Sequence, residues 1–302
     1  MIVESLNQSR YDEPTLPLIS TKRVKRALIF LLVIIFVGAC FSAAKVDFSK
    51  LIDGLPRIAS WFTQMFPPDL ENIDRVLRDA FQTLAMATIG TIGALIICIP
   101  LAPLAARNTT PNMFVYRMVR AVFAALRGTE ILVFALIFVA AVGFGPFTGV
   151  LAIMFNMVGA LGKLLTEVIE PADPGPVEAV ELTGASSLRA YRYALVPDVW
   201  PNIVAVTLYI WEFNVRASTV LGIVGAGGIG QTLKDSIDLL DFPKMATVLG
   251  VILIMVITID TLSGFLRRRV LNPETASVRE GVPKRLSQTY GEALESGRNK
   301  QK

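Results

Sequence analysis

Polar and apolar residues fall into long blocks along this chain. Apolar runs of about 20 residues are long enough to cross a hydrocarbon core of about 30 Å as helices. Such runs occur at residues 27–44, 80–106, 121–142, 147–165, 200–220 and 245–265. The strands of a membrane barrel would instead show alternating runs of about 10 residues. The pattern therefore predicts an all-α, polytopic membrane protein with six transmembrane helices.

The polar segments between these runs divide the chain. We expect a cytoplasmic tail, a first transmembrane helix, an external loop with an interfacial helix, a membrane core that includes a polar loop, and a second cytoplasmic tail. Their ranges are 1–26, 27–44, 45–79, 80–269 (polar loop 171–199) and 270–302. Pro100 and Pro103 are expected to kink the second helix, and Pro197 or Pro201 to start the fifth.

Basic residues indicate the orientation of the helices. Arginines cluster at 107–120, at 189–192 and at 267–269, and six crossings place all three clusters on the side of the N-terminus. Because short cytoplasmic loops are enriched in Lys and Arg, both termini are predicted to be cytoplasmic. The segment Val37–Cys40 also resembles a lipoprotein cleavage site, but such signals seldom precede polytopic proteins, and an uncleaved helix is favoured.

Composition narrows the classes of chemistry. Hydrophobic residues make up 53% of the 302 residues and charged residues 18%, against about 25% charged in a soluble domain. Histidine is absent, which excludes His-ligated metals and His general bases. No nucleophile–base pair or metal cluster stands out, so we predict no catalytic residues, no metal site and no enzymatic activity on this chain.

Polar side chains inside the apolar runs are the candidates for a substrate pathway or gate. A charge in the bilayer is costly, so such residues usually pair or line a pathway. The pairs Arg127/Glu130 and Glu212/Arg216 have helical spacing, which fits either salt bridges that fix packing or guanidinium groups that meet an oxyanion. Lys163 is interpreted as a snorkelling anchor, and Asp260 is left unassigned. The candidates are Arg127, Glu130, Asn156, Glu212, Asn214, Arg216 and Ser218.

A glycine-rich segment follows the fifth run. Gly225, Gly227, Gly228 and Gly230 form a G-x-G-x-x-G pattern after strand-like residues 220–224, which alone would suggest a dinucleotide site. The apolar helices on both sides lack the required βαβ context, so an external turn with unusual dihedral angles is favoured. No G-x-x-x-x-G-K-[ST] sequence occurs, so any ATP hydrolysis must belong to another chain.

The polar loop at 171–199 resembles the EAA loop of bacterial ABC importer permeases. The matching order is Glu-Ala, then Gly, then Pro, although Ala194 and Val196 replace the usual Ile and Leu. The resemblance implies a short helix, a turn and a second helix at the membrane surface that contact a cytoplasmic ATPase. The residues that carry it are Glu178, Ala179, Val180, Glu181, Gly184, Ala185, Leu188 and Pro197.

Longer strings resemble the permease subunits of phosphonate ABC importers. They are 129–134, 170–178, 213–220 and 224–230, within a resemblance that covers about 81–269. It implies a five-helix core like that of methionine and molybdate importers in the bacterial inner membrane. It also implies a homodimer, two ATPase subunits that use ATP and Mg, an external solute-binding protein, and alternating-access import of phosphonate, phosphite or phosphate. A gradient-driven anion transporter and an importer for another small solute remain alternatives.

Overall fold

The computed structural model describes residues 21–45 and 47–271 of the chain. Within these residues every regular element is a helix, and no strand occurs. Five helices are long and apolar enough to cross a membrane, or six if one sharply bent pair counts as a single span. The predicted all-helical membrane fold is therefore confirmed. Most of the two predicted tails lies outside the described residues.

The chain divides into two compact units, residues 1–62 and 63–302. The first contains α1 (Thr21–Ala43), which includes the first predicted span, and most of α2 (Phe48–Gln64). Cys40 lies within α1. Helix α2 buries no residue, and Trp61 and Phe62 are exposed on it. The segment that was predicted to be external thus contains a helix, as expected; its external side and its place at a membrane interface stay predictions.

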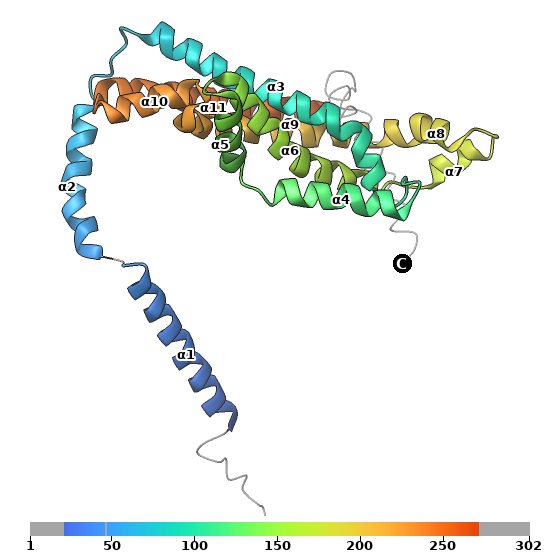
Figure 1. The fold of residues 1–302 in the computed structure, drawn as a ribbon, viewed down its shortest axis with the longest axis horizontal. Helices are drawn as coiled ribbons and strands as arrows, with labels where there is room; N and C mark the ends of the chain where they lie inside the picture. The colour runs from blue at the N-terminus through green and yellow to red at the C-terminus, as the bar shows by residue number, and fades with distance from the viewer. Residues whose placement is uncertain (1–20, 46, 272–302) are drawn as a thin grey trace, which may run out of the picture. The chain divides into compact units, whose positions relative to one another are not determined.

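The second unit is a helical bundle around α6 (Pro146–Ile169). Helix α6 packs against α3 (Ile73–Ala105), α4 (Met113–Arg127), α5 (Ile131–Val142) and α9 (Val196–Leu221) (Figure 1). Small residues allow close approach: a side chain at Gly162 would overlap the Phe123 ring, and one at Gly90 would overlap Ile153. Close packing through glycine is how helices associate where lipid removes most of the hydrophobic driving force.

Several helices are longer than the apolar runs predict. Helix α3 begins at Ile73 rather than residue 80, and α4 begins at Met113, so Arg117 and Arg120 lie in a helix and not in a loop. The Asn112 side chain accepts a hydrogen bond from the Phe114 amide at 2.6 Å and caps α4. Helix α11 (Phe242–Leu271) continues beyond the end of its apolar run at residue 265 and through the three arginines at 267–269. A capped or polar turn extends a helix without changing its apolar stretch.

The third predicted span is broken. Helices α4 and α5 meet at an angle of 87° across residues 128–130. The run that was given as a single span therefore contains a sharp bend. Glu130 is the N-cap residue of α5, with extended backbone, and its side chain makes no capping bond. The sequence run 121–142 thus forms two elements with different directions.

A second sharp bend follows α9. The π-helical turn η2 (Gly222–Ala226) leads to α10 (Ile229–Asp238), and α11 then returns along the bundle (Figure 1). Gly225, Gly227 and Gly228 have φ of 98°, 82° and 71°, which other residues rarely adopt. A Cβ at Gly230 would collide with the Thr219 carbonyl oxygen. The glycines permit the unusual dihedral angles and close backbone approach that were expected; residues 220–224, however, are helical and not strand-like.

Candidate functional site

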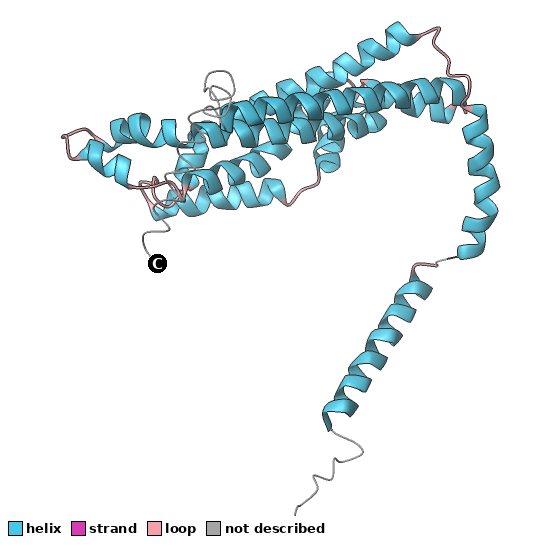
Figure 2. Cartoon of the chain, turned by 180° about the vertical axis from the view of Figure 1, so that it is seen from behind, coloured by secondary structure: helices cyan, strands magenta, loops and turns pink. Residues whose placement is uncertain are grey.

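A helical hairpin projects beyond one end of the bundle (Figures 1 and 2). It consists of α7 (Gly175–Glu181) and α8 (Ser187–Ala190), and it occupies the middle of the predicted polar loop. The chain reverses at Gly184, whose φ is 85°. Leu182 and Leu188 are 88% and 79% exposed. Exposed large apolar side chains on such a projection are typical of a surface that another protein covers.

The candidate coupling residues all lie on or just after this hairpin. Most are exposed, and Val180 and Ala185 are half-buried. Among the eight, Leu188 has the largest exposed apolar side chain, while Glu178 and Glu181 add negative charge to α7. The set, with Leu182 beside it, offers an apolar and acidic surface. The full set is Glu178, Ala179, Val180, Glu181, Gly184, Ala185, Leu188 and Pro197.

The second arm of the hairpin is continuous with a transmembrane helix. Helix α8 runs through the π-helical turn η1 (Tyr191–Leu195) into α9, and residues 187–226 form one span candidate. The Val196 amide donates to the Tyr191 carbonyl, one residue further back than in an α-helix. Pro197 lies in the first turn of α9, as expected, whereas Pro201 lies inside it; the helical backbone also continues back through η1 to α8. The second arm of the hairpin and α9 are therefore one continuous helix.

Glu170 anchors the base of the hairpin. Its carboxylate accepts hydrogen bonds from the Arg120 guanidinium at 2.7 Å and from the Arg107 amide at 3.2 Å. The Tyr191 hydroxyl donates to the Asn108 carbonyl at 3.2 Å, which joins η1 to the α3–α4 loop. Arg107 donates to the Tyr116 hydroxyl at 3.0 Å, and this bond raises the pKa of Arg107. These contacts tie the hairpin to α3, α4 and α6.

A network of four charges joins α9 and α11. Glu212 accepts from Arg216 at 2.5 Å and from Arg267 at 3.1 Å, and Arg216 lies 3.4 Å from Asp260. The predicted Glu212/Arg216 pair is therefore present. The Glu212 side chain is 14% exposed, whereas those of Arg216 and Asp260 are 50% and 47% exposed. Half-exposed charges on apolar helices need a polar surrounding, because contact with lipid is costly.

Asn214 and Ser218 lie on the opposite side of α9 and face α3. The Asn214 amide donates to the Thr91 hydroxyl at 2.8 Å, and the Ser218 hydroxyl lies 3.4 Å from the Thr83 carbonyl, to which it donates. Both side chains are fully buried. They pack α9 onto α3, whereas Glu212 and Arg216 face α11. The structure therefore does not bring all the α9 candidates to one surface.

The candidates near the α4–α5 bend lie apart from this network. Arg127 and Glu130 form no ion pair among the described residues, because α4 ends at Arg127 and helical spacing no longer applies. The Asn156 amide donates to the Thr129 carbonyl at 2.8 Å and holds the bend. Arg127 is exposed on this chain at the C-terminal end of α4, where the helix dipole favours a cation by about 0.3–1 kcal/mol. A guanidinium within a membrane protein usually also meets a counter-charge or a water-filled cavity.

Sequence reasoning missed three residues of these clusters. Asp260 and Arg267 are seven residues apart on α11, so they share one helix face, and this spacing was a signal that could have assigned them. Glu170 was noted only within a matching string, although it joins Arg120 and the hairpin base. Lys163, read as a snorkelling anchor, forms an ion pair with Glu167 at 3.2 Å.

The fold and the projecting hairpin define a membrane-embedded subunit of a transport system. Residues 98–272 match the family of binding-protein-dependent transport system inner membrane components. The chain belongs to this family, and it is a multi-pass membrane protein.

Individual relatives agree with this family, and a solved structure shares the fold. A Stutzerimonas stutzeri protein whose name assigns it to a phosphite transport system as a permease is 59% identical over 240 residues, 80% of this chain and 85% of the relative. The phosphite transport system permease protein PtxC of the same organism is 38% identical, and the match covers 86% of this chain and 98% of PtxC. An inward-facing structure of the MetNI methionine ABC transporter has a TM-score of 0.59 at 23% identity, over 67% of this chain and 99% of that chain.

Proposed function

We propose that this chain is the permease subunit of an ATP-driven importer of a small phosphorus oxyanion: phosphite, phosphonate or phosphate. The observation that carries the proposal is the exposed apolar hairpin that continues without a break into α9. The names of the two phosphite permease relatives support the substrate class. Two copies of this chain would form a homodimer that encloses the pathway. Two ATPase subunits would bind on the side of the membrane that carries the hairpins, and a solute-binding protein would bind on the opposite side.

The mechanism would be alternating access. ATP and Mg bind the partner ATPases, which move together and displace the hairpins. Because α8, η1 and α9 form one helix, the displacement reorients α9 and the charge network it carries. The pathway then opens outward to accept the anion and, after hydrolysis, opens to the cytoplasm. The chain itself contributes no hydrolytic chemistry in this scheme.

Removing the apolar hairpin surface should release the ATPase. The double change Leu182→Asp and Leu188→Asp places charge on side chains that are 88% and 79% exposed, so the fold should persist while the contact is lost. Affinity purification in mild detergent, followed by mass spectrometry of the co-purifying chains, measures this. We expect an ATPase with the wild type and at least about tenfold less with the double variant.

Leu239→Asp is the matched control. Leu239 is 74% exposed between α10 and α11, at the end of the bundle away from the hairpin (Figure 1). It should retain the ATPase. A wild-type preparation without any ATPase, or a double variant that keeps it fully, would contradict the proposal.

A further inference from the structure

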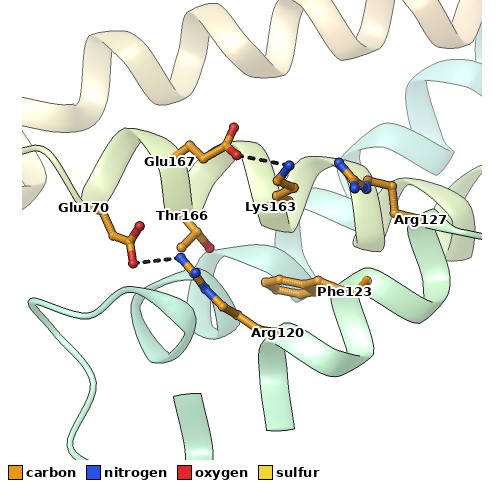
Figure 3. A pocket seen from close by; sticks show the side chains of 8 residues that line it. Arg120, Phe123, Arg127, Lys163, Thr166, Glu167 and Glu170 are labelled. Atoms are coloured by element: carbon orange, nitrogen blue, oxygen red, sulfur yellow. Dashed lines mark hydrogen bonds and ion pairs between the residues drawn. The ribbon is translucent and has the colours of Figure 1, made fainter. Parts of the chain in front are cut away.

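A charged pocket of about 360 Å³ lies between α4 and α6, apart from the hairpin and from the α9–α11 network (Figure 3). Helix α4 contributes two arginines and a phenylalanine, α6 contributes a lysine and a glutamate, and the residue that follows α6 is a second glutamate. These residues are Arg120, Phe123, Arg127, Lys163, Glu167 and Glu170. Because water occupies about 30 Å³ per molecule, the pocket has room for a small anion with several waters.

The charges of the pocket do not balance. Arg120 pairs with Glu170 at 2.7 Å, and Lys163 pairs with Glu167 at 3.2 Å. Arg127 is the third cation, and it forms no ion pair with any described residue. Three cations against two carboxylates leave one positive charge, and Arg127 carries it. The pocket therefore matches one anion of a single charge.

Arg127 is also placed where it needs such a partner. Its backbone packs against Gly159 in the middle of α6, ten residues before Ile169, which corresponds to about 15 Å along the helix. Helix α6 is a span candidate, and a guanidinium beside a membrane span usually meets a counter-charge or a water-filled cavity. Its planar set of donors suits two oxygen atoms of one tetrahedral anion.

We propose that this pocket binds a tetrahedral phosphorus oxyanion, with Arg127 as the direct ligand and Lys163 as a second cation beside it. The Arg120–Glu170 pair forms the wall nearest the hairpin base. The occupant is either a free oxyanion such as phosphate or the phosphate group of an anionic phospholipid, which present the same charged oxygens. The first source rests on the proposed function, because the transported anion would then occupy the permease itself.

The test measures binding of radiolabelled inorganic phosphate to the purified complex in neutral detergent. We expect saturable binding that Arg127→Gln weakens at least about tenfold, the effect of losing a charged hydrogen-bond partner. Glu167→Gln frees Lys163 and should tighten binding, which keeps the test decisive if Arg127→Gln does not fold. Arg117→Gln is the matched control, because Arg117 lies on α4, exposed and outside the pocket.

A second arm separates the two sources. Nanodiscs of phosphatidylcholine alone are compared with nanodiscs that contain phosphatidylglycerol. A phospholipid occupant predicts Arg127-dependent retention of phosphatidylglycerol in native mass spectrometry and competition with phosphate; a free oxyanion predicts phosphate binding unaffected by phosphatidylglycerol. The proposal is wrong if binding of phosphate and binding of phosphatidylglycerol are both independent of Arg127. It is also wrong if Arg117→Gln weakens binding as much as Arg127→Gln does.

ATP-driven uptake, measured after the same complex is reconstituted into proteoliposomes, keeps this inference separate from the proposed function. ATP-driven uptake without Arg127-dependent binding would contradict the pocket proposal but not the proposed importer function. Arg127-dependent phosphate binding without ATP-driven uptake would contradict the proposed importer function but not the pocket proposal.

Discussion

Single charges in the membrane bundle of this permease family member are stabilised in two different ways. Glu212 is shielded and meets two guanidinium groups, at 2.5 and 3.1 Å, so its charge is compensated locally. Arg127 has no ion pair among the described residues and lines a pocket instead. The first arrangement fixes α9 to α11, and the second leaves a cation available to a ligand.

Replacing Glu212 should destabilise the protein more than replacing Asp260. Glu212→Gln leaves Arg216 and Arg267 with one remaining carboxylate at 3.4 Å from Arg216. Loss of one partner from a buried pair costs about 3–5 kcal/mol, and the partial exposure of both arginines reduces the expected cost to about 1–2 kcal/mol. Thermal unfolding in detergent checks the order, with Asp260→Asn as the control. An equal or larger loss for Asp260→Asn would contradict the network described here.

The residue pairs show what spacing predicts and what it does not. The spacing of Glu212 and Arg216 predicted their ion pair because both lie inside α9. The spacing of Arg127 and Glu130 failed because the helix ends between them. Asn214 was predicted to lie with Arg216 in a pathway, yet it faces α3. Sequence spacing predicts which side chains share a helix face only while the helix continues. It does not predict which neighbouring helix packs against that face.

At the scale of elements, close contacts through small residues hold the bundle together. Helix α6 presents Gly159 and Gly162 to α4, where side chains would overlap Leu126 and Phe123. The apolar runs predicted the existence of these helices. They did not predict the 87° bend between α4 and α5 or the unbroken course of α8 into α9, because both depend on packing and on one π-helical turn.

Gly159→Ala should weaken the contact between α4 and α6. A Cβ at this position would overlap the Arg127 amide nitrogen and lie 2.9 Å from the Leu126 Cβ. Overpacking of this kind costs about 1–3 kcal/mol, and the melting temperature should fall. Gly250→Ala on α11 is the control, because nothing lies within 4 Å of its Cβ position. Equal melting temperatures for the two variants would mean that the α4–α6 contact is not closely packed.

At the scale of the whole molecule, the apolar runs were sufficient to predict a helical membrane protein, and the EAA-like order pointed to its family. The described residues bear out the helices, and the family match covers residues 98–272. The sequence of one chain does not locate the pathway, because it does not say what covers an exposed charge. Arg216 and Asp260 are half-exposed on the single chain. In the proposed importer, a second permease chain and the pathway between the two would surround them.

The most direct test measures uptake of radiolabelled phosphite into proteoliposomes that hold the permease with its ATPase, with ATP enclosed and the solute-binding protein outside. Gly184 has φ of 85°, which Asn tolerates and Val does not, so Gly184→Val should distort the hairpin and Gly184→Asn should preserve it. We predict uptake that requires ATP, is retained by Gly184→Asn and falls at least about tenfold in Gly184→Val, in a bundle of unchanged melting temperature. Uptake driven by an ion gradient without ATP, or wild-type uptake by Gly184→Val, would contradict the account.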